Sequence, residues 1–278
     1  MQKGNSPRER FKEIVSRDDE QINFAEAALL IAAEEYPRLD IALYLEKLDR
    51  FGDLVRDRAA QAQSSRDVLS AINATLFGEL CFRGNVEHYY DPRNSFLNEV
   101  IDRRTGIPIT LTAVYIEVAR RVGLHVEGVG MPGHFIAKLA TESGDLFIDA
   151  FNGGRMFGQA GCADLLSDMS GGKIKLRPEH LEAVTKKQIL ARMLANLLGV
   201  YAAGDQARAL RAIERILLIN PGSPPHVRDR GLLLATLGRT TEAIAELERY
   251  LMLAPDAPDA NSIREQVKTV RQSQARLN

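Results

Sequence analysis

The spacing of apolar residues predicts three helices in the N-terminal part of the chain, up to about position 80. Residues 25–36 form a nearly continuous apolar run that follows Asn23, has Glu26 at the spacing of a capping box, and stops before Pro37. A second helix is expected to begin at Asp40, since apolar side chains recur at helical spacing from there to residue 55. The same periodicity predicts a third helix over residues 68–80, after a polar stretch at 61–66.

The middle of the chain has a different pattern. Residues 82–98 are rich in turn-forming residues, and a strongly apolar helix is expected over 108–122, with Pro108 at its first position and Gly123 at its end. Short β-like segments follow at 125–129, 134–139 and 146–151. Because Glu-Ser-Gly-Asp separates the last two segments, they are predicted to form a hairpin.

The last part of the chain is helical and repetitive. The residues that recur at one constant offset are Gly204 and Gly238, Ala209 and Ala243, Ile213 and Leu247, Leu217 and Leu251, Pro221 and Pro255, and Pro224 and Pro258. This offset is the period typical of tetratricopeptide repeats, in which glycine permits a tight turn, alanine a close approach of two helices, and proline the end of a helix. Two repeats cannot bury a solenoid core alone, so a further helix over 261–275 or the preceding domain is expected to cover them.

The net charge, the cysteine content and the lengths of the apolar stretches exclude several classes of protein. The net charge of -1 argues against a nucleic-acid binder, because such proteins need an excess of positive charge. Two cysteines, outside any CxxC pair, cannot form a disulfide framework and fit a reducing compartment. No apolar h-region is visible in the charged segment up to Glu20, and no stretch reaches about 18 apolar residues, so we expect a cytoplasmic protein with no membrane span.

The spacing of one histidine and one aspartate would allow them to form a hydrogen-bonded pair. His134 follows Pro-Gly at a predicted strand start, and Asp149 lies in the next predicted strand. If the hairpin turns near Ser143, the two side chains fall within hydrogen-bond reach on one face. A carboxylate beside an imidazole fixes its tautomer and raises the basicity of its other nitrogen. The pair is therefore either a catalytic dyad or a structural pair that supports the turn.

Several motifs together resemble the transglutaminase-like superfamily, and more specifically the bacterial invasion-regulator B ("Sir B" type) family. The matching stretches are Phe-Arg-Gly-Asn at 82–85, Tyr-Asp-Pro-Arg-Asn-Ser-Phe-Leu at 90–97, Arg-Thr-Gly-Ile-Pro-Ile-Thr-Leu at 104–111, Pro-Gly-His-Phe at 132–135 and Phe-Ile-Asp-Ala-Phe-Asn-Gly-Gly at 147–154. The resemblance extends from about residue 20 to 275. It implies a papain-like α/β core joined to tetratricopeptide repeats, with a site made by Cys at a helix N-terminus, then His, then Asp.

The sequence departs from that pattern at the nucleophile. The position that matches the superfamily's cysteine is Pro108, which has no nucleophilic atom, while His134 and Asp149 match the pattern. Thr110, two positions on, and Cys81 are the alternative nucleophiles, although a small packed thiol is the usual state of a cysteine. Cys162, expected in a loop or at a helix start, is the weakest candidate.

The polar loop before the long helix offers further site residues. Asp91, Arg93 and Asn94, with Pro108 and Asn152, are predicted to line the cleft around His134, or the loop residues hydrogen bond to the backbone and hold the loop closed. His88 and His125 are too loosely spaced from the pair to indicate a metal site, and glycine-rich phosphate motifs are absent. No metal or cofactor is predicted.

The resulting expectation is a mostly helical α+β protein. It has an N-terminal helical region (1–80), a transglutaminase-like core with a small antiparallel sheet (81–182) and a repeat domain of helical hairpins (186–278). The expected function is a non-catalytic scaffold that binds a protein or peptide partner through its cleft and repeats. The alternatives are a hydrolase or acyltransferase on peptide or amide bonds with an unconventional nucleophile, and non-covalent catalysis with His134 as general base on water.

Overall fold

The chain forms two compact units, the first ending at Met193 and the second beginning at Leu194. The computed structural model describes residues 6–277, with side chains described as far as residue 272. Within that range the chain is mostly helical with small sheets, so the α+β class predicted from the sequence is confirmed. No helix among these residues has the length and apolar character needed to cross a membrane.

Local capping explains where the helices of the first unit begin. Its α-helices are α1 (Pro7–Val15), α2 (Phe24–Ala33), α3 (Ile41–Arg58), α4 (Ser65–Asn73), α5 (Leu97–Arg103), α6 (Pro108–Arg121), α7 (Gln159–Ser170) and α8 (Lys186–Tyr201), which crosses the boundary between the units. The Asn23 side chain accepts a hydrogen bond from the backbone N–H of Glu26 at 3.3 Å, and Asp40 caps α3 in the same way. The capping box at Asn23 is half formed, because the Glu26 carboxylate pairs with Arg10 instead.

Two of the expected helices differ in length from the prediction. The first stops at Ala33 rather than residue 36. The third begins earlier, at Ser65 behind a Ser64 cap, and beyond Asn73 it continues as a short π-helix over Ala74–Glu79. The polar stretch 61–66, expected as a loop or a helix end, therefore includes the first two residues of α4. A π-helix cannot be read from apolar spacing, because it depends on how the segment is held by its neighbours.

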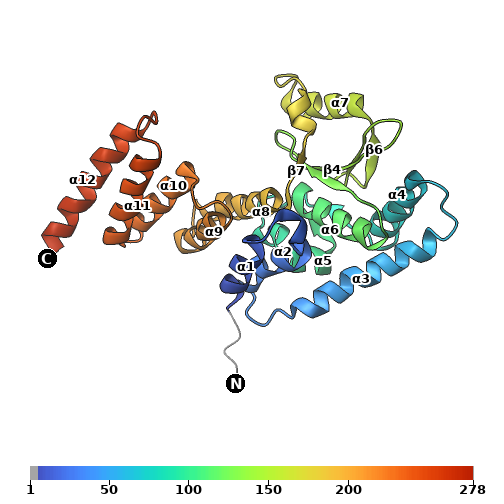
Figure 1. Cartoon of the computed structure of the whole chain (residues 1–278), viewed down its shortest axis with the longest axis horizontal. Coiled ribbons are helices and arrows are strands. Elements are labelled where there is room, and N and C mark those ends of the chain that lie inside the picture. The colour runs from blue at the N-terminus through green and yellow to red at the C-terminus, as the bar shows by residue number, and fades with distance from the viewer. Residues whose placement is uncertain (1–5, 278) are drawn as a thin grey trace. The chain divides into compact units, whose positions relative to one another are not determined.

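A five-stranded antiparallel sheet forms the centre of the first unit. Its strand order is β6 (Arg155–Phe157), β5 (Leu146–Asp149), β4 (Ile136–Leu139), β3 (Glu127–Val129) and β7 (Ala183–Val184). The predicted hairpin is the β4–β5 pair, with Ala137 opposite Ile148. The helix α6 packs against β3 and β4, and α7 packs against β5 and β6. Figure 1 shows these two helices on opposite sides of the sheet.

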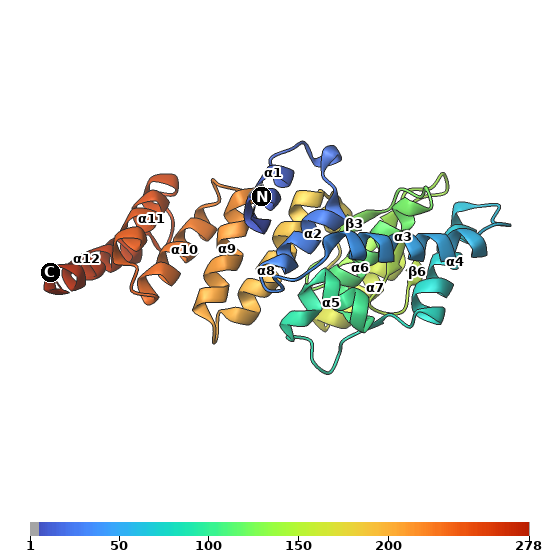
Figure 2. The ribbon, with the colours of Figure 1, turned by 90° about the horizontal axis from the view of Figure 1, so that it is seen from below.

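A second, parallel pair of strands lies beside the N-terminus of α6. It joins β1 (Arg83–Gly84) to β2 (Thr105–Gly106), with Gly84 opposite Gly106. On another side of α6 runs α3, which Figure 2 shows as the long helix of this unit. A Cβ at Gly52 would lie 2.8 Å from the Cβ of Arg121, so glycine permits this close approach.

The second unit consists of successive helical hairpins, as the internal repeat of the sequence predicts. Its helices are the last part of α8, α9 (Gln206–Ile219), α10 (Pro224–Thr236), α11 (Thr240–Leu253) and α12 (Ala260–Leu277). The additional helix expected over 261–275 is α12, and its Ile263 and Val267 are buried with Leu247. Gly231 of α10 has Leu247 of α11 so close that a Cβ would lie 2.7 Å away, which fixes the separation of these two helices.

Candidate functional site

His134 and Asp149 lie together in the first unit. The Nε2 atom of His134 is 3.0 Å from Oδ1 of Asp149, and only 5% of the imidazole and 1% of the carboxylate are exposed. The contact is bent, since the ring N–H does not point straight at the oxygen. Asp149 ends β5, and continuing the hairpin register by one step places it opposite Ile136, two residues beyond His134.

A turn holds His134 in this position. The backbone N–H of His134 donates to Met131 at 3.1 Å, and Gly133 has a φ of +74°, which favours glycine. The strand β4 begins at Ile136, so His134 precedes it and does not start it as the sequence pattern indicated. Thr112 of α6 donates a hydrogen bond to the carbonyl of Phe135 at 3.3 Å and thereby ties this turn to α6.

Asp149 also organises the segment that follows it. Its Oδ1 accepts hydrogen bonds from the backbone N–H groups of Phe151 (3.1 Å) and Asn152 (3.3 Å), and its Oδ2 accepts from the Asn152 amide at 2.7 Å. Burial by itself raises the pKa of Asp149. The hydrogen bond and charge of His134, together with the Asn152 hydrogen bonds, outweigh burial and bring the pKa below its ordinary value. The carboxylate is therefore ionised at neutral pH.

An aromatic cluster covers the imidazole. The Phe151 ring meets the His134 ring edge to face at a centroid distance of 6.1 Å, and it meets the Tyr89 ring in the same way at 6.2 Å. The other side of Phe151 lies against Gly84, where a Cβ would come within 2.6 Å of the ring. Phe151 therefore packs between His134 and the β1–β2 pair.

Arg192 is a site residue that sequence reasoning missed. Its Nη2 donates to the carbonyl oxygens of His134 (2.8 Å) and Met131 (3.3 Å), and its guanidinium lies 5.2 Å from the centroid of the Phe135 ring. Arg192 thus holds the backbone on both sides of the turn. No local signal marks it, since it lies 58 residues along the chain in α8.

The N-terminus of α6 carries the residue that replaces the expected nucleophile. Pro108 is the first residue of α6 and is buried. The Thr110 hydroxyl is fully buried and donates to the carbonyl of Asn94 at 2.7 Å, while it accepts from the backbone N–H of Ile107 at 3.2 Å. Thr110 therefore caps the helix and anchors the preceding loop.

The two cysteines have opposite environments. Cys81 is exposed, with a positive φ of 56°, so the small packed thiol expected there is wrong. It follows the π-helix that ends at Glu79, and its thiol lies 3.4 and 3.6 Å from the carbonyl oxygens of Gly78 and Glu79. Cys162 is the fourth residue of α7 and is fully buried, and burial raises its pKa to about 12.

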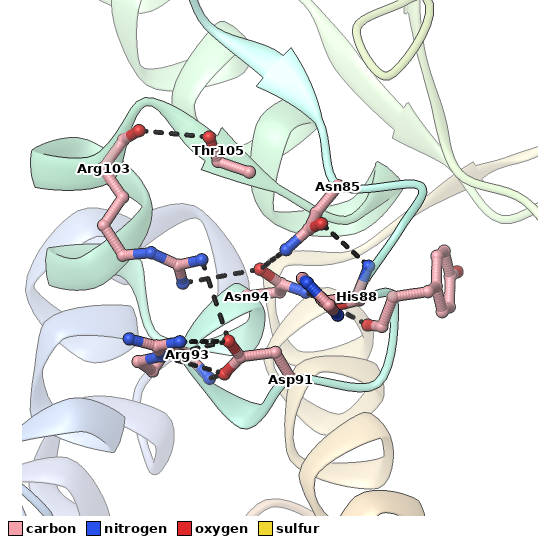
Figure 3. Close-up of polar contacts among 8 residues, drawn as sticks. Asn85, His88, Asp91, Arg93, Asn94, Arg103 and Thr105 are labelled. Atoms are coloured by element: carbon pink, nitrogen blue, oxygen red, sulfur yellow. Dashed lines mark hydrogen bonds and ion pairs between the residues drawn. The ribbon is translucent and has the colours of Figure 1, made fainter.

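The polar loop is held together by Asn94. Figure 3 shows its side chain at the centre of the loop, where its Nδ2 donates to the carbonyls of His88 (2.8 Å) and Tyr89 (3.1 Å). Its Oδ1 accepts from the Asn85 amide at 2.9 Å, with Arg103 at 3.5 Å. Asn94 is fully buried, so these bonds satisfy a side chain that closes the loop.

Asp91 and Arg93 form the outer part of the same network. Two side-chain nitrogens of Arg93, Nε and Nη2, make three hydrogen bonds to the Asp91 carboxylate at 2.6–3.1 Å, and this hydrogen bonding lowers the pKa of Asp91. Both residues also line a surface hollow of about 480 Å³, together with Glu87, His88, Tyr89 and Tyr90. Between residues 6 and 277, no three His, Cys, Asp or Glu side chains gather closely enough to hold a metal ion.

Comparisons with known proteins agree with the two units. Residues 42–195 match the model of the transglutaminase-like superfamily, and residues 200–268 match that of the tetratricopeptide repeat. A "UPF0162 protein" of Xylella fastidiosa is 38% identical over 91% of this chain and 92% of its own length. "Protein SirB1" of Salmonella typhimurium is 26% identical over 90% of this chain and 94% of its own. Mouse "F-box only protein 21" is 34% identical over 48% of this chain and 22% of its own.

These matches bear on both function and family. A transglutaminase-like domain joined to tetratricopeptide repeats, in a relative of SirB1, indicates a regulatory or protein-binding role. The superfamily model covers more than half of the chain, and the Xylella relative, at 38% identity, matches nearly all of it. This chain therefore belongs to the transglutaminase-like superfamily.

Proposed function

We propose that the protein is a regulatory binding module in which the transglutaminase-like unit acts as a scaffold without covalent chemistry. The surface around Tyr89 and Tyr90 engages a protein or peptide partner, and the helical repeats add a second binding surface. His134 and Asp149 then shape the scaffold rather than transfer acyl groups.

The observation that carries this proposal is the chemistry at the start of α6. Pro108 occupies the first helical position, where a thiol would be activated by the helix N-terminus. The nearest hydroxyl in the sequence, that of Thr110, is buried and committed to the helix cap and to Asn94. A covalent route needs an exposed nucleophile beside a base, and neither residue supplies one.

Exposed aromatic residues support a binding role for the adjacent loop. Tyr90 is 79% exposed, Val86 is 76% exposed and Tyr89 is 38% exposed, beside the hollow that Asp91 and Arg93 line. Tyrosine and arginine are enriched at protein interfaces, because each offers a large apolar surface together with hydrogen-bonding groups. Since Asn94 keeps the loop ordered from within, binding would cost little additional conformational entropy.

The proposal is tested by site-specific photo-crosslinking in the cells that express the protein. The full chain carries p-benzoylphenylalanine at Tyr90, and the matched control carries it at Ile174, which is 42% exposed on the loop after α7. We expect a discrete partner to be captured at Tyr90 and not at Ile174. The purified partner should bind wild type and His134→Gln equally and keep its mass. A partner that is cleaved or modified by wild type, and not by His134→Gln, would refute the scaffold.

A second candidate function rests on the free nitrogen of His134. Its Nε2 faces Asp149. Its Nδ1 makes no hydrogen bond with the described residues, and this atom is not fully enclosed by them. Such an imidazole can act as a general base on water without a protein nucleophile. This candidate predicts turnover that is lost in His134→Gln although the variant stays folded.

A cysteine at position 108 tests whether the start of α6 faces His134. If it does, the thiol of Pro108→Cys at the helix N-terminus should react with iodoacetamide faster than Cys81, and His134→Gln in the same chain should slow it. A rate that does not depend on His134 would show that position 108 does not face the imidazole. The Cys81→Ser background removes the competing exposed thiol.

A further inference from the structure

A cavity of about 510 Å³ lies in the first unit, at the C-terminal half of α6. It shares no residue with the His134 cluster. Its walls are mainly apolar and come from α2, α6, the segment leading into β3, β7 and the start of α8; the apolar residues are Phe24, Ile116, Leu124, Val126, Val184 and Ile189. A volume of this size with mainly apolar walls is typical of small-molecule sites. The polar and charged residues of the lining are Asp19, Glu117, Arg120, His125, Glu127, Thr185 and Lys186.

One buried acid, Glu117, lines this cavity. Its side chain is only 3% exposed. The Oε2 atom accepts hydrogen bonds from Arg120 at 3.0 and 3.3 Å and from Arg121 at 2.5 Å. The other carboxylate oxygen, Oε1, accepts no hydrogen bond from the described residues and is not fully enclosed by them. Because Oε1 is not fully enclosed and Glu117 lines the cavity, a donor group on a ligand can hydrogen bond to this oxygen in place of water.

The Lys and Arg side chains that line the cavity, Lys186 and Arg120, are already engaged. Lys186 donates from Nζ to the carbonyls of Glu20 (3.0 Å) and Ile22 (2.9 Å), and its backbone N–H is bound by Asp19. Arg120, with a side chain 59% exposed at the edge, is directed to Glu117. Of the buried charged side chains in the wall, Glu117 thus offers an open acceptor, and an anionic ligand placed against it would meet its carboxylate; His125 also lines the cavity but is exposed.

We propose that this cavity binds a small molecule with an apolar body and one hydrogen-bond donor group, an ammonium or a hydroxyl, directed at Oε1 of Glu117. The apolar body replaces water along the walls, and the donor completes the coordination of the buried carboxylate. The inference does not rest on the proposed scaffold function, because the two sites have no residue in common.

Indole compounds provide a direct test, because the chain contains no tryptophan and its own indole background is absent. The full chain is titrated into tryptamine (ammonium head), tryptophol (hydroxyl head) and indole-3-propanoate (carboxylate head) while indole emission and anisotropy are recorded. We expect tryptamine, tryptophol or both to bind with Kd below about 1 mM. The carboxylate should bind at least about tenfold more weakly, since it lacks a donor and is repelled by Glu117.

Two variants locate the binding. Ile116→Phe adds bulk to the cavity wall without touching the ion pairs and should weaken the best probe at least about tenfold. Glu117→Gln should remove the preference for tryptamine over the carboxylate. If Glu117→Gln fails to fold, Ile116→Phe still shows whether the probe binds in this cavity. Equal binding of the carboxylate, no binding by any probe, or binding unaffected by Ile116→Phe would each overturn the proposal.

Discussion

Removing the Asp149 carboxylate should destabilise the first unit strongly. In Asp149→Ala, the buried Nε2 of His134 and the backbone N–H groups of Phe151 and Asn152 lose the carboxylate that faces them. Leaving a buried donor without its acceptor costs about 1–3 kcal/mol for each donor, so we expect a total loss of about 3–5 kcal/mol. Asp149→Asn keeps one oxygen for the backbone but loses the charge, so we expect about 1–3 kcal/mol. The matched control is Asp145→Asn on the same hairpin, whose carboxylate is 46% exposed.

Hydrogen exchange of the full chain, read by mass spectrometry, separates the two units. For Asp149→Ala, the slowest amides of β4 and β5 should exchange roughly two orders of magnitude faster, which corresponds to about 3 kcal/mol. Peptides from residues 206–270 and the Asp145→Asn control should be unchanged. Unchanged protection in β4 and β5 would refute the reasoning that Asp149 holds His134 and the turn after β5.

The pH dependence provides an independent check with a definite sign. The folded state lowers the pKa of Asp149, so its stabilisation is complete above the unfolded value of about 3.9 and is lost as the pH falls through the lower folded value. The stability difference between wild type and Asp149→Asn should therefore shrink as the pH falls below about 4. A difference that grows on acidification would contradict the assigned direction.

Three further predictions concern residues around the site. Iodoacetamide at about pH 8 should label exposed Cys81 in the folded chain but not Cys162, because burial raises the pKa of Cys162 to about 12; peptide mapping with and without denaturant decides this. Gly84→Ala should cost about 1–3 kcal/mol in urea unfolding, since its Cβ would come within 2.6 Å of an aromatic ring. Gly78→Ala, at an exposed position with no atom within 4 Å, should not destabilise the protein by more than about 0.5 kcal/mol, and equal effects of the two variants would exclude the clash. Thr110→Val should cost about 1–3 kcal/mol and Thr110→Ser much less, because only valine removes the hydroxyl that caps α6.

Much of the site could be predicted from sequence because it depends on short-range geometry. The hairpin between β4 and β5 has only a short connection, so the approach of His134 to Asp149 follows from the turn and strand register. The position of Pro108 follows equally from local preference, since proline is favoured at the first position of a helix. The sequence predicts a polar loop around Asn94 but leaves open whether its side chain lines a cleft or closes the loop. In the structure, its hydrogen bonds to the carbonyls of His88 and Tyr89 close the loop.

The sequence by itself determined the helix starts at Asn23 and Asp40, the period of the repeats and the hairpin, because caps, apolar periodicity and turn residues act over a few neighbours. Only the tertiary structure decided that Phe151 covers His134, that Arg192 holds the same turn from α8, and that Glu117 keeps one oxygen open in a cavity. The physical reason is that these features depend on tertiary packing. Arg192 lies 58 positions from His134, and the places of Phe151 and Glu117 depend on how loops and whole helices pack on the sheet, which no local pattern specifies.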